Sequence, residues 1–423
     1  MSADSGGETL DRFTERGLDW LAEPATSALV HDQVARRIDE LESDAGASLV
    51  KRNLVRAVFR MQLDGFGAVI VKRYAVRGPL DWIKYTFRAS RALEEWRVGR
   101  WLDEAGIATA VPLAMAERRR GVLRDAALVT REIKDSVHLN EYVEEHLMCS
   151  PARPAIDALR HALFDQLAQI VRRVHDAGFV HNDLHGGNVL VNGPPDSAQV
   201  HIIDLHSVKR YRRRTSPAGK RWFDLLKLLH SMRTCSTPAE RVAMCRAYED
   251  EGQGPSKTQV TALLASGRLS DVLETRLLAM ERKRIRSRTQ RSLDRSSRHD
   301  VTQRGGFRIH HLRTIPVADL LPLIAAHRES MRAGGAAVLK DARKSALTRQ
   351  TLHSGGVTRS VVVKEYRCAG VAARLKNLVR RPRPIASWVA GNGLVVRGFD
   401  VAAPLALLMD GRGPALSSAF IVM

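Results

Sequence analysis

The chain has 423 residues, of which 44% are hydrophobic and 27% charged, and its formal net charge at pH 7 is +21. This length predicts two or three domains, and the composition is typical of a soluble protein with well-packed cores. The longest apolar runs are too short for a membrane-spanning helix, and the first residues lack the basic and apolar regions of a secretory signal. We therefore expect a cytoplasmic protein.

The cysteines and the net charge narrow the class of protein and its possible partners further. The four cysteines are far apart and form no Cys-x-x-Cys, which indicates reduced thiols and argues against a zinc site or a disulfide framework. The positive charge favours an anionic partner, namely a nucleotide, a nucleic acid, an anionic lipid or an acidic glycan. Arginine supplies 54 of the 67 basic residues, so part of this excess reflects a general preference for arginine.

The first third of the chain predicts a helical extension followed by a small α+β lobe. Residues 8–45 place apolar side chains at helical spacing, so residues 1–45 are expected to form an N-terminal helical extension. Within residues 46–133, the runs LVRAVFRMQL and AVIVKRY flank the turn sequence DGFG and predict a hairpin. A helix near residues 88–104 and the strand pair PLAMAE and AALVTRE complete the lobe.

Residues 134–300 predict a second, mainly helical lobe. Residues 155–175 place their apolar side chains on one helical face and lead into the stretch VHNDLHGGNVLV, residues 180–191. Two short strands, VLV and HIIDL, follow this stretch, and then a helix over residues 221–232. Residues 276–313 hold twelve basic and three acidic residues, and with few aromatic residues among them they predict a solvated helix and linker rather than a nucleic-acid patch.

An internal repeat follows at an offset of 292 residues. Residues 69–117 and 361–409 share 16 identities in 49 positions, including Lys72 with Lys364 and Trp96 with Trp388. We therefore expect a basic, helical linker over residues 301–340 and a second, incomplete copy of the first lobe over residues 341–423. Ser387 replaces Glu95 in this copy, and no counterpart of the stretch VHNDLHGGNVLV follows it.

The reason for the incomplete copy is open between two explanations. The copy is either a vestigial accessory lobe, or the chain is truncated from a longer tandem protein. The chain ends inside a predicted strand, which favours truncation because domains do not normally end in the middle of a sheet.

The residues that carry chemistry match the needs of phosphoryl transfer. Asp183 precedes Asn188 by five positions, and Asp204 follows after a short hairpin. In phosphoryl transfer, one carboxylate accepts the proton of the attacking hydroxyl, while an amide oxygen and a second carboxylate hold Mg²⁺ on the phosphates. We expect Asp183 to be this base, and Asn188 and Asp204 to be the metal ligands.

A second group of residues is expected to hold the nucleotide. Lys72, in a strand of the first lobe, would neutralise phosphate charge and be oriented by Glu95 on the adjacent helix. The turn ahead of Lys72 reads ASLVKRNLV and contains no G-x-G-x-x-G, so Lys51 and Arg52 are expected to bind phosphate instead. Glu132 completes the expected cofactor-binding set, and the cofactors are ATP and Mg²⁺.

Histidines near the loop raise the alternative of a zinc site formed by His181, His185, His201 and His206. A zinc-binding pair four positions apart belongs on a helix, but Gly186 and Gly187 and the following apolar strand disfavour a helix here. His181 is better explained as a core histidine that braces the loop.

Two motifs now connect the chain to known families. The residues His181-Asn182-Asp183 followed by Asn188 resemble the His-Arg-Asp…Asn catalytic loop of the protein-kinase-like fold. More narrowly, GFVHNDLHGGNVLV followed by VHIIDLHSVKR resembles the lipopolysaccharide kinase family, whose members phosphorylate Kdo or heptose. The resemblance covers residues 46–300 and implies an α+β, bilobal protein-kinase-like fold, with a β-rich N-lobe and a helical C-lobe.

The resemblance also implies roles and partners. It assigns ATP binding to Lys72, the helix partner to Glu95, the base to Asp183, and the bracing of the catalytic loop to Asp224. It implies an anionic saccharolipid acceptor, and a peripheral location at the cytoplasmic face of the inner membrane. The basic segments 208–214 and 276–313 would hold the lipid headgroup by charge, and nucleic acid is not an expected partner.

Two other functions are considered. The first is a Ser/Thr or RIO-like protein kinase, which is disfavoured by the missing glycine-rich loop and by the absence of an Ala-Pro-Glu-like ending after Asp204. The second is a non-catalytic basic scaffold that binds membrane or nucleic acid. If the scaffold function is correct, Asp183→Asn would leave ATP turnover unchanged.

Overall fold

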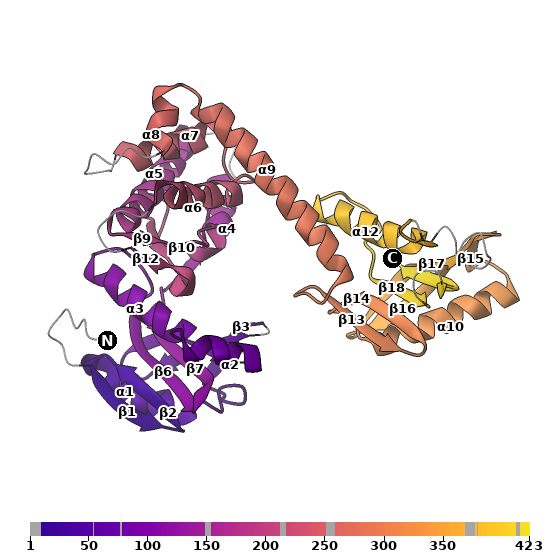
Figure 1. Cartoon of the computed structure of the whole chain (residues 1–423), viewed down its shortest axis with the longest axis horizontal. Coiled ribbons are helices and arrows are strands. Elements are labelled where there is room, and N and C mark those ends of the chain that lie inside the picture. Colours follow the sequence, from indigo (N-terminus) through magenta and orange to yellow (C-terminus); the bar gives the residue numbers. More distant parts are fainter. Residues whose placement is uncertain are drawn as a thin grey trace. The chain divides into compact units, whose positions relative to one another are not determined.

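The structure is a computed structural model that describes residues 10–53, 55–76, 78–148, 154–211, 217–250, 259–368, 377–378, 380–411 and 415–423. It contains two compact units, Met1–Leu278 and Ala279–Met423 (Figure 1). Both units combine helices with strands, so the prediction of a mixed α and β fold is confirmed. None of the described helices is long and apolar enough to cross a membrane.

The first unit begins with a seven-stranded antiparallel sheet in the order β1-β2-β6-β7-β5-β4-β3. Its strands are β1 (Asp11–Glu15), β2 (Leu18–Ala22), β3 (Ala47–Arg52), β4 (Arg56–Leu63), β5 (Gly67–Ala75), β6 (Pro112–Arg120) and β7 (Val122–Arg131). Its helices are α1 (Pro24–Gln33), the 3-10 turn η1 (Ala35–Arg37), α2 (Pro79–Thr86) and α3 (Arg91–Glu104). The expected hairpin at residues 64–67 is confirmed, since β4 pairs with β5 from Leu63 and Gly67 onward.

The expected helical extension over residues 1–45 is wrong for its first part. Residues 11–22 form the hairpin β1–β2, whose turn at Arg16 and Gly17 has positive φ at both positions, as a two-residue hairpin turn requires. The burial of Leu18, Trp20 and Ala22 alternates along β2, which is the strand period. In so short a segment, apolar spacing of three or four residues did not distinguish a helix from this alternation.

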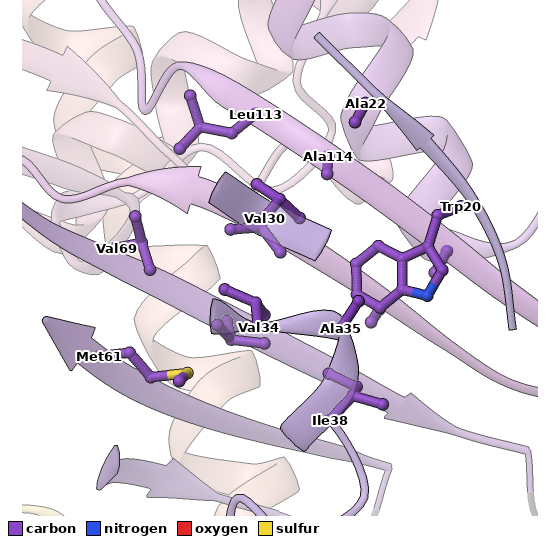
Figure 2. Packing of buried hydrophobic residues seen from close by; sticks show 14 of the residues in the cluster. Trp20, Ala22, Val30, Val34, Ala35, Ile38, Met61, Val69, Leu113 and Ala114 are labelled. Carbon is purple, nitrogen blue, oxygen red and sulfur yellow. The ribbon is translucent and has the colours of Figure 1, made fainter. Parts of the chain in front are cut away.

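Helices cover both faces of this sheet. Figure 2 shows Val30 of α1 and the following Val34 lying over the sheet, between Trp20 of β2 and the side chains of Val69 and Met61. Because successive strand residues face opposite sides, Tyr74 lies on the other face, with Trp96 of α3. The side chain of Ser90 caps α3 by accepting a hydrogen bond from the backbone N–H of Leu93 at 3.0 Å. The helix is thereby fixed beside the strand that carries Lys72.

The remainder of the first unit is mainly helical. Its elements are β8 (Ser136–His138), α4 (Leu139–Tyr142), the π-helical turn η2 (Val143–Met148), α5 (Pro154–Asp176), β9 (Phe179–Val180), the 3-10 turn η3 (Gly186–Asn188), β10 (Val189–Asn192), β11 (Gln199–Ile202), the 3-10 turn η4 (Leu205–Ser207), β12 (Lys209–Arg210), α6 (Ala218–Ser231), α7 (Pro238–Asp250) and α8 (Gln259–Ala265). Helix α9 (Leu269–Gln290) and the 3-10 turn η5 (Arg291–Leu293) follow. Strand β10 pairs with β8 and β11, and β9 pairs with β12, so short strands flank the predicted catalytic loop.

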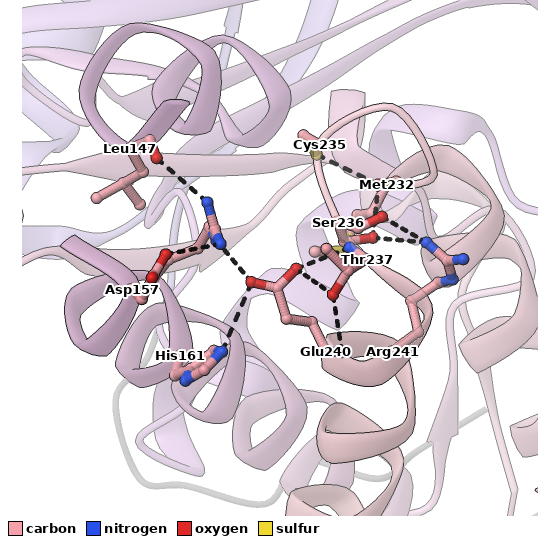
Figure 3. Close-up of polar contacts among 10 residues, drawn as sticks. Leu147, Asp157, His161, Met232, Cys235, Ser236, Thr237, Glu240 and Arg241 are labelled. Carbon is pink, nitrogen blue, oxygen red and sulfur yellow. Dashed lines mark hydrogen bonds and ion pairs between the residues drawn. The ribbon is translucent and has the colours of Figure 1, made fainter. Parts of the chain in front are cut away.

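A buried carboxylate joins two of these helices. Glu240 of α7 accepts hydrogen bonds from the N–H and the hydroxyl of Thr237, and Thr237 caps the helix in return (Figure 3). Arg160 of α5 donates to the other carboxylate oxygen of Glu240 at 2.6 Å. Burial alone would raise the pKa of Glu240, but these hydrogen bonds lower it below its ordinary value. The charged pair therefore holds α7 against α5.

The second unit holds another seven-stranded antiparallel sheet, in the order β13-β14-β18-β19-β17-β16-β15. Its elements are β13 (His299–Arg304), β14 (Phe307–Leu312), α10 (Val317–Ala333), β15 (Val338–Ala342), β16 (Ser345–Ser354), β17 (Val357–Arg367), α12 (Arg383–Val396), β18 (Ala406–Asp410) and β19 (Ser418–Val422). Position by position, its strand order corresponds to that of the first sheet. Helices α3 and α12 also begin 292 residues apart.

The expected linker over residues 301–340 is wrong. These residues supply β13, β14, α10 and most of β15, which are integral parts of the second sheet and its cover. The basic residues that suggested a linker, such as Arg304, lie on exposed strand positions, while Ile309 and Leu320 are fully buried. The boundary between the two units follows Leu278, earlier than the expected end of the helical lobe at residue 300.

Candidate active site

The predicted pair of Lys72 and Glu95 is present. Lys72 extends from β5 and donates a hydrogen bond to the Glu95 carboxylate on α3, and both side chains are largely buried. The hydroxyl of Tyr74 donates to the second oxygen of the same carboxylate at 2.5 Å. Burial and the Glu95 charge hold the pKa of Tyr74 well above its ordinary value, so the hydroxyl stays a donor. Glu95 is thus fixed from two sides and fixes Lys72 in turn.

The predicted catalytic loop lies between β9 and β10. The side-chain amide of Asn188 donates to the backbone carbonyl of Asp183 at 2.9 Å, which joins the two ends of the loop. Its amide oxygen, the atom that could accept a cation, is not used by this bond. A Cβ at Gly186 would lie 2.3 Å from the side-chain oxygen of Asn140, so the close turn requires glycine there.

His181 and Asp224 support the loop from behind, as predicted. The fully buried Asp224 of α6 accepts a hydrogen bond from the backbone N–H of His181 at 2.6 Å. The ring of His181 contacts the backbone carbonyl of Ile203 through Nε2, at 3.1 Å. Burial lowers the pKa of His181 below its ordinary value, so its ring is neutral at pH 7. His181 therefore connects the catalytic loop to the residue before Asp204.

Asp204 lies at the centre of a cluster of charges. Its Oδ1 atom is 2.8 Å from Arg56 of β4 and 2.7 Å from Nδ1 of His206. Burial alone would raise its pKa, but the hydrogen bond with His206 and the charges of Arg56 and Lys72 hold the pKa far below the ordinary value. Asp204 is thus ionised at any physiological pH. Its backbone is left-handed, with φ of 63°, which fixes an unusual direction for the side chain.

These groups surround one cavity of about 480 Å³, a size that suits a nucleotide. The predicted residues that line it are Lys51, Lys72, Glu132, Asn188 and Asp204. Glu132 is held by two hydrogen bonds from Arg60, at 2.6 and 2.9 Å. Arg52 differs from the expectation, because it pairs with Glu42 and does not line this cavity.

Asp183 lies at an open position. Its side chain is 53% exposed, which leaves room for an acceptor hydroxyl. Nζ of Lys227 lies 3.5 Å from Oδ1 of Asp183, and Nε2 of His185 lies 3.9 Å from Oδ2. Lys227 also donates to the backbone carbonyl of Asn182. The carboxylate therefore has a basic group on each side.

Three residues of the site were not predicted from the sequence, namely Arg56, Tyr74 and Lys227. A signal existed for two of them. Tyr74 stands two positions after Lys72, on the same face of the strand, and Lys227 stands one helical turn after Asp224. No comparable local signal identifies Arg56, because its partner Asp204 is 148 residues away.

The donor set fits Mg²⁺ better than zinc. Asn188 and Asp204 offer an amide oxygen and a carboxylate at the same cavity, and Mg²⁺ prefers oxygen ligands. All four histidines of the zinc alternative have protein partners: His181 contacts Ile203, His185 contacts Gly187, His201 contacts Asn192 and His206 contacts Asp204. In the part of the chain that the structure describes, the one cluster of potential metal-binding side chains is Glu95, Asp204 and His206, and Glu95 is already paired with Lys72.

The family model of the lipopolysaccharide kinases (Kdo/WaaP) matches residues 37–248, which are half of the chain. The chain belongs to the lipopolysaccharide kinase family. The matched region contains Lys72, Glu95, Asp183, Asn188 and Asp204. The family resemblance predicted from the catalytic loop is therefore confirmed.

Two curated relatives of the family are similar to part of the chain. The lipopolysaccharide core heptose(I) kinase WaaP of Pseudomonas aeruginosa is 31% identical over 136 residues, covering 31% of this chain and 48% of the relative. The 3-deoxy-D-manno-octulosonic acid kinase of Vibrio cholerae is 26% identical over 140 residues, covering 33% of this chain and 50% of the relative. The chain thus spans about half the length of the curated relatives it matches.

Among solved structures, WaaP in complex with acyl carrier protein has 22% sequence identity and a TM-score of 0.45. The match covers 61% of this chain and 97% of that one.

Proposed function

We propose that the chain is an ATP-dependent phosphotransferase that phosphorylates a sugar hydroxyl, of Kdo or heptose, on a lipopolysaccharide-type glycolipid. The observation that carries the proposal is the convergence of Lys72, Asn188 and Asp204 on one cavity, beside the open carboxylate of Asp183. The same constellation lies within the region that matches the lipopolysaccharide kinase family.

In the proposed reaction, the oxygen of the sugar hydroxyl attacks the γ-phosphorus of ATP, and the bond between this phosphorus and ADP breaks. Asp183 accepts the proton of the attacking hydroxyl, and Lys227 beside it keeps the carboxylate in place. Lys72, oriented by Glu95, neutralises phosphate charge. Asn188 and Asp204 would hold Mg²⁺, which supplies further charge neutralisation on the phosphates. Arg56 lines the same cavity beside Asp204 and would contact the phosphates there.

The proposal extends to the architecture. The first unit would be a bilobal kinase-like fold, with the sheet and α3 as the N-lobe and the helices around α5 and α6 as the C-lobe. The second unit would be an incomplete N-lobe, which is supported by the matching strand orders of the two sheets. In this unit, the hydroxyl of Tyr366 donates to Ser387 at 2.9 Å, where Tyr74 in the first unit donates to Glu95.

We also propose a peripheral location at the cytoplasmic face of the inner membrane, where a saccharolipid acceptor would be presented. Support comes from the net charge of +21 and from the basic residues of α9, which include Arg282, Arg286 and Arg288. Residues 212–214 of the basic segment 208–214 lie outside the described residues.

Labelled ATP tests the proposal with two acceptors, a dephosphorylated core saccharolipid and a generic protein substrate. We expect label in the saccharolipid and a loss of about 10²–10⁴-fold in kcat for Asp183→Asn, because this variant removes the general base. Nucleotide binding by the variant should be retained, since Asp183 is not a lining residue of the cavity. Label that enters protein but never saccharolipid would favour the protein-kinase alternative and reject the proposal.

A further inference from the structure

Helix α2 and the residues directly after it carry an exposed apolar and basic surface that the catalytic site does not use. We propose that this surface docks on a bilayer of anionic lipids, with Ile83 and Phe87 inserted among the headgroups and Lys84 and Arg88 bound to their phosphates. The inference rests on the proposed function, because it names the element that would make the peripheral membrane contact.

The apolar side chains of α2 point in two directions. Tyr85 is 9% exposed and Trp82 lies beside the guanidinium of Arg124, so these two residues anchor the helix to the protein. Ile83 and Phe87, four positions apart and hence on one side of the helix, are 61% and 85% exposed. A solvent-facing pair of large apolar residues on so short a helix indicates a contact outside the chain.

Basic residues lie beside this apolar pair. Lys84 and Arg88 are exposed and follow Ile83 and Phe87 by one position each, so an apolar row and a basic row run next to each other. Residues 79–91 contain three basic residues and one acidic residue. One acidic side chain, that of Glu94, lies near these basic residues. Burial raises the pKa of its carboxyl group, and the charges of His206, Arg88 and Lys84 offset part of that rise. Adjacent apolar and basic rows are typical of helices that lie in the membrane interface.

The second copy of the internal repeat keeps this pattern of apolar and basic residues, although it has lost Glu95. The stretch IKYTFR at 83–88 corresponds to LKNLVR at 375–380, with both apolar positions and both basic positions retained. The second copy has Ser387 in place of Glu95 but holds five basic and no acidic residues over 371–383. Of the four retained positions the structure describes Arg380, which is exposed, and the nearby Leu378, which corresponds to Thr86, is 65% exposed. The repeat therefore keeps this apolar and basic sequence pattern in a copy that has lost a catalytic residue, which indicates a function separate from catalysis.

A bilayer explains two such sequence patterns in one chain better than a single protein partner does. A membrane presents the same headgroups at every point, so two weak contacts on one chain add through effective concentration. A protein partner with one complementary site would engage only one of them. Helix α2 also connects β5 and α3, the elements that carry Lys72 and Glu95, so docking would occur next to the ATP-binding lobe.

Vesicle sedimentation with the full chain tests the proposal, using vesicles of equal parts phosphatidylglycerol and phosphatidylcholine against vesicles of phosphatidylcholine alone. We expect binding to the anionic vesicles only. Lys84→Gln with Arg88→Gln should weaken it roughly 25-fold, at about fivefold per basic residue. Ile83→Ser with Phe87→Ser should weaken it at least about tenfold. Adding Lys376→Gln with Arg380→Gln should weaken it further.

The matched control replaces Arg12 and Arg120, which are exposed elsewhere on the first sheet, with glutamine. This variant has the same net charge as Lys84→Gln with Arg88→Gln and should bind vesicles like the unaltered chain. Equal binding by the α2 variants and this control would overturn the proposal. So would a change from dimer to monomer on Ile83→Ser with Phe87→Ser without loss of vesicle binding, since it would make the surface a contact between copies.

Phosphorylation of detergent-dispersed acceptor separates this proposal from the proposed function. We expect the α2 variants to phosphorylate dispersed saccharolipid normally and vesicle-embedded saccharolipid poorly. If the unaltered chain binds vesicles but phosphorylates neither form, the docking proposal stands and the proposed substrate is wrong. If it phosphorylates both forms and the variants do so equally well, the docking proposal is wrong and the proposed function stands.

Discussion

At the scale of single residues, Arg56 lines the cavity of the candidate site and Arg52 does not. Arg56 pairs with Asp204 in the cavity, whereas Arg52 pairs with Glu42 away from it. The β3–β4 pairing contains a register shift between Leu49 and Lys51, and the strand period of two then sets which side chains face the cavity. The types of residue in β3 and β4 do not predict this register shift.

Arg56→Ala should weaken ATP binding about 10- to 100-fold, because it removes a charged hydrogen-bond donor from the phosphate side of the cavity. Titration with a fluorescent nucleotide measures the effect. Arg52→Ala is the matched control and should bind nucleotide normally. Weaker binding by Arg52→Ala alone would show that the sequence-based expectation for Arg52 was correct after all.

The other site residues could be predicted because the sequence carries their context locally. Asp183 and Asn188 stand in one short loop, and Lys72 is followed by an amphipathic helix that contains Glu95. The prediction of Glu95 as the ion-pair partner of Lys72 is confirmed, since Glu95 is 4% exposed and bonded to Lys72. Arg56 required knowledge of a contact across 148 residues, which no single-sequence pattern supplies.

At the scale of elements, α3 and α12 provide a natural comparison. Trp96 and Trp388 are both almost fully buried and stand at equivalent positions of the repeat. Trp96 packs with Tyr74, whose hydroxyl donates to Glu95. Trp388 packs with Tyr366, whose hydroxyl donates to Ser387, the residue at the position of Glu95. The equivalent tryptophans therefore accompany a Lys–Glu ion pair in the first unit only.

Truncating each tryptophan to alanine should cost about 3–5 kcal/mol of stability in its own unit. Trp96→Ala should also weaken nucleotide binding, because α3 would no longer hold Glu95 against Lys72. Trp388→Ala should leave nucleotide binding unchanged. Chemical denaturation and nucleotide titration of both variants measure the two effects, and equal loss of binding in the two variants would contradict the assignment.

Helices and strands whose apolar residues repeat at a regular spacing were predicted correctly. Elements whose apolar spacing fits both a helix and a strand were not. The long apolar face of residues 155–175 correctly predicted α5, which spans Pro154–Asp176. The hairpins β1–β2 and β13–β14 were mistaken for a helix and a linker because they are short and their exposed faces carry many charges. Their membership in a sheet depends on β6 and β18, strands that are almost a hundred residues away.

At the scale of the whole molecule, buried histidines make the stability depend on pH. Burial and the charge of Arg308 lower the pKa of His310 from 6.5 to about 4, and burial also lowers the pKa values of His175, His181, His201 and His299. A histidine with a lowered pKa in the folded state binds its proton more readily when unfolded. The free energy of unfolding therefore falls as the pH drops below 6.5.

For His310 the expected loss is about 3 kcal/mol between pH 6.5 and pH 4 in the second unit. Denaturant titrations at pH 7 and pH 4.5 measure the change, and His310→Gln should reduce the difference between them. An unchanged pH dependence in the variant would show that other groups carry the effect. A histidine stabilised by an acidic partner has a raised pKa in the folded state, so its contribution to the free energy of unfolding would instead grow as the pH falls.

The matching strand orders of the two sheets have a consequence for synthesis. Two sheets of one design in a single chain can exchange strands while they form, and such misassembly is a characteristic failure of repeat proteins. Here the strands of the first sheet all lie before residue 132, and the second sheet begins at His299. Because the ribosome delivers the chain from its N-terminus, the first sheet can close before any competing strand has emerged. The mainly helical segment between the two sheets therefore also delays the synthesis of the second set of strands.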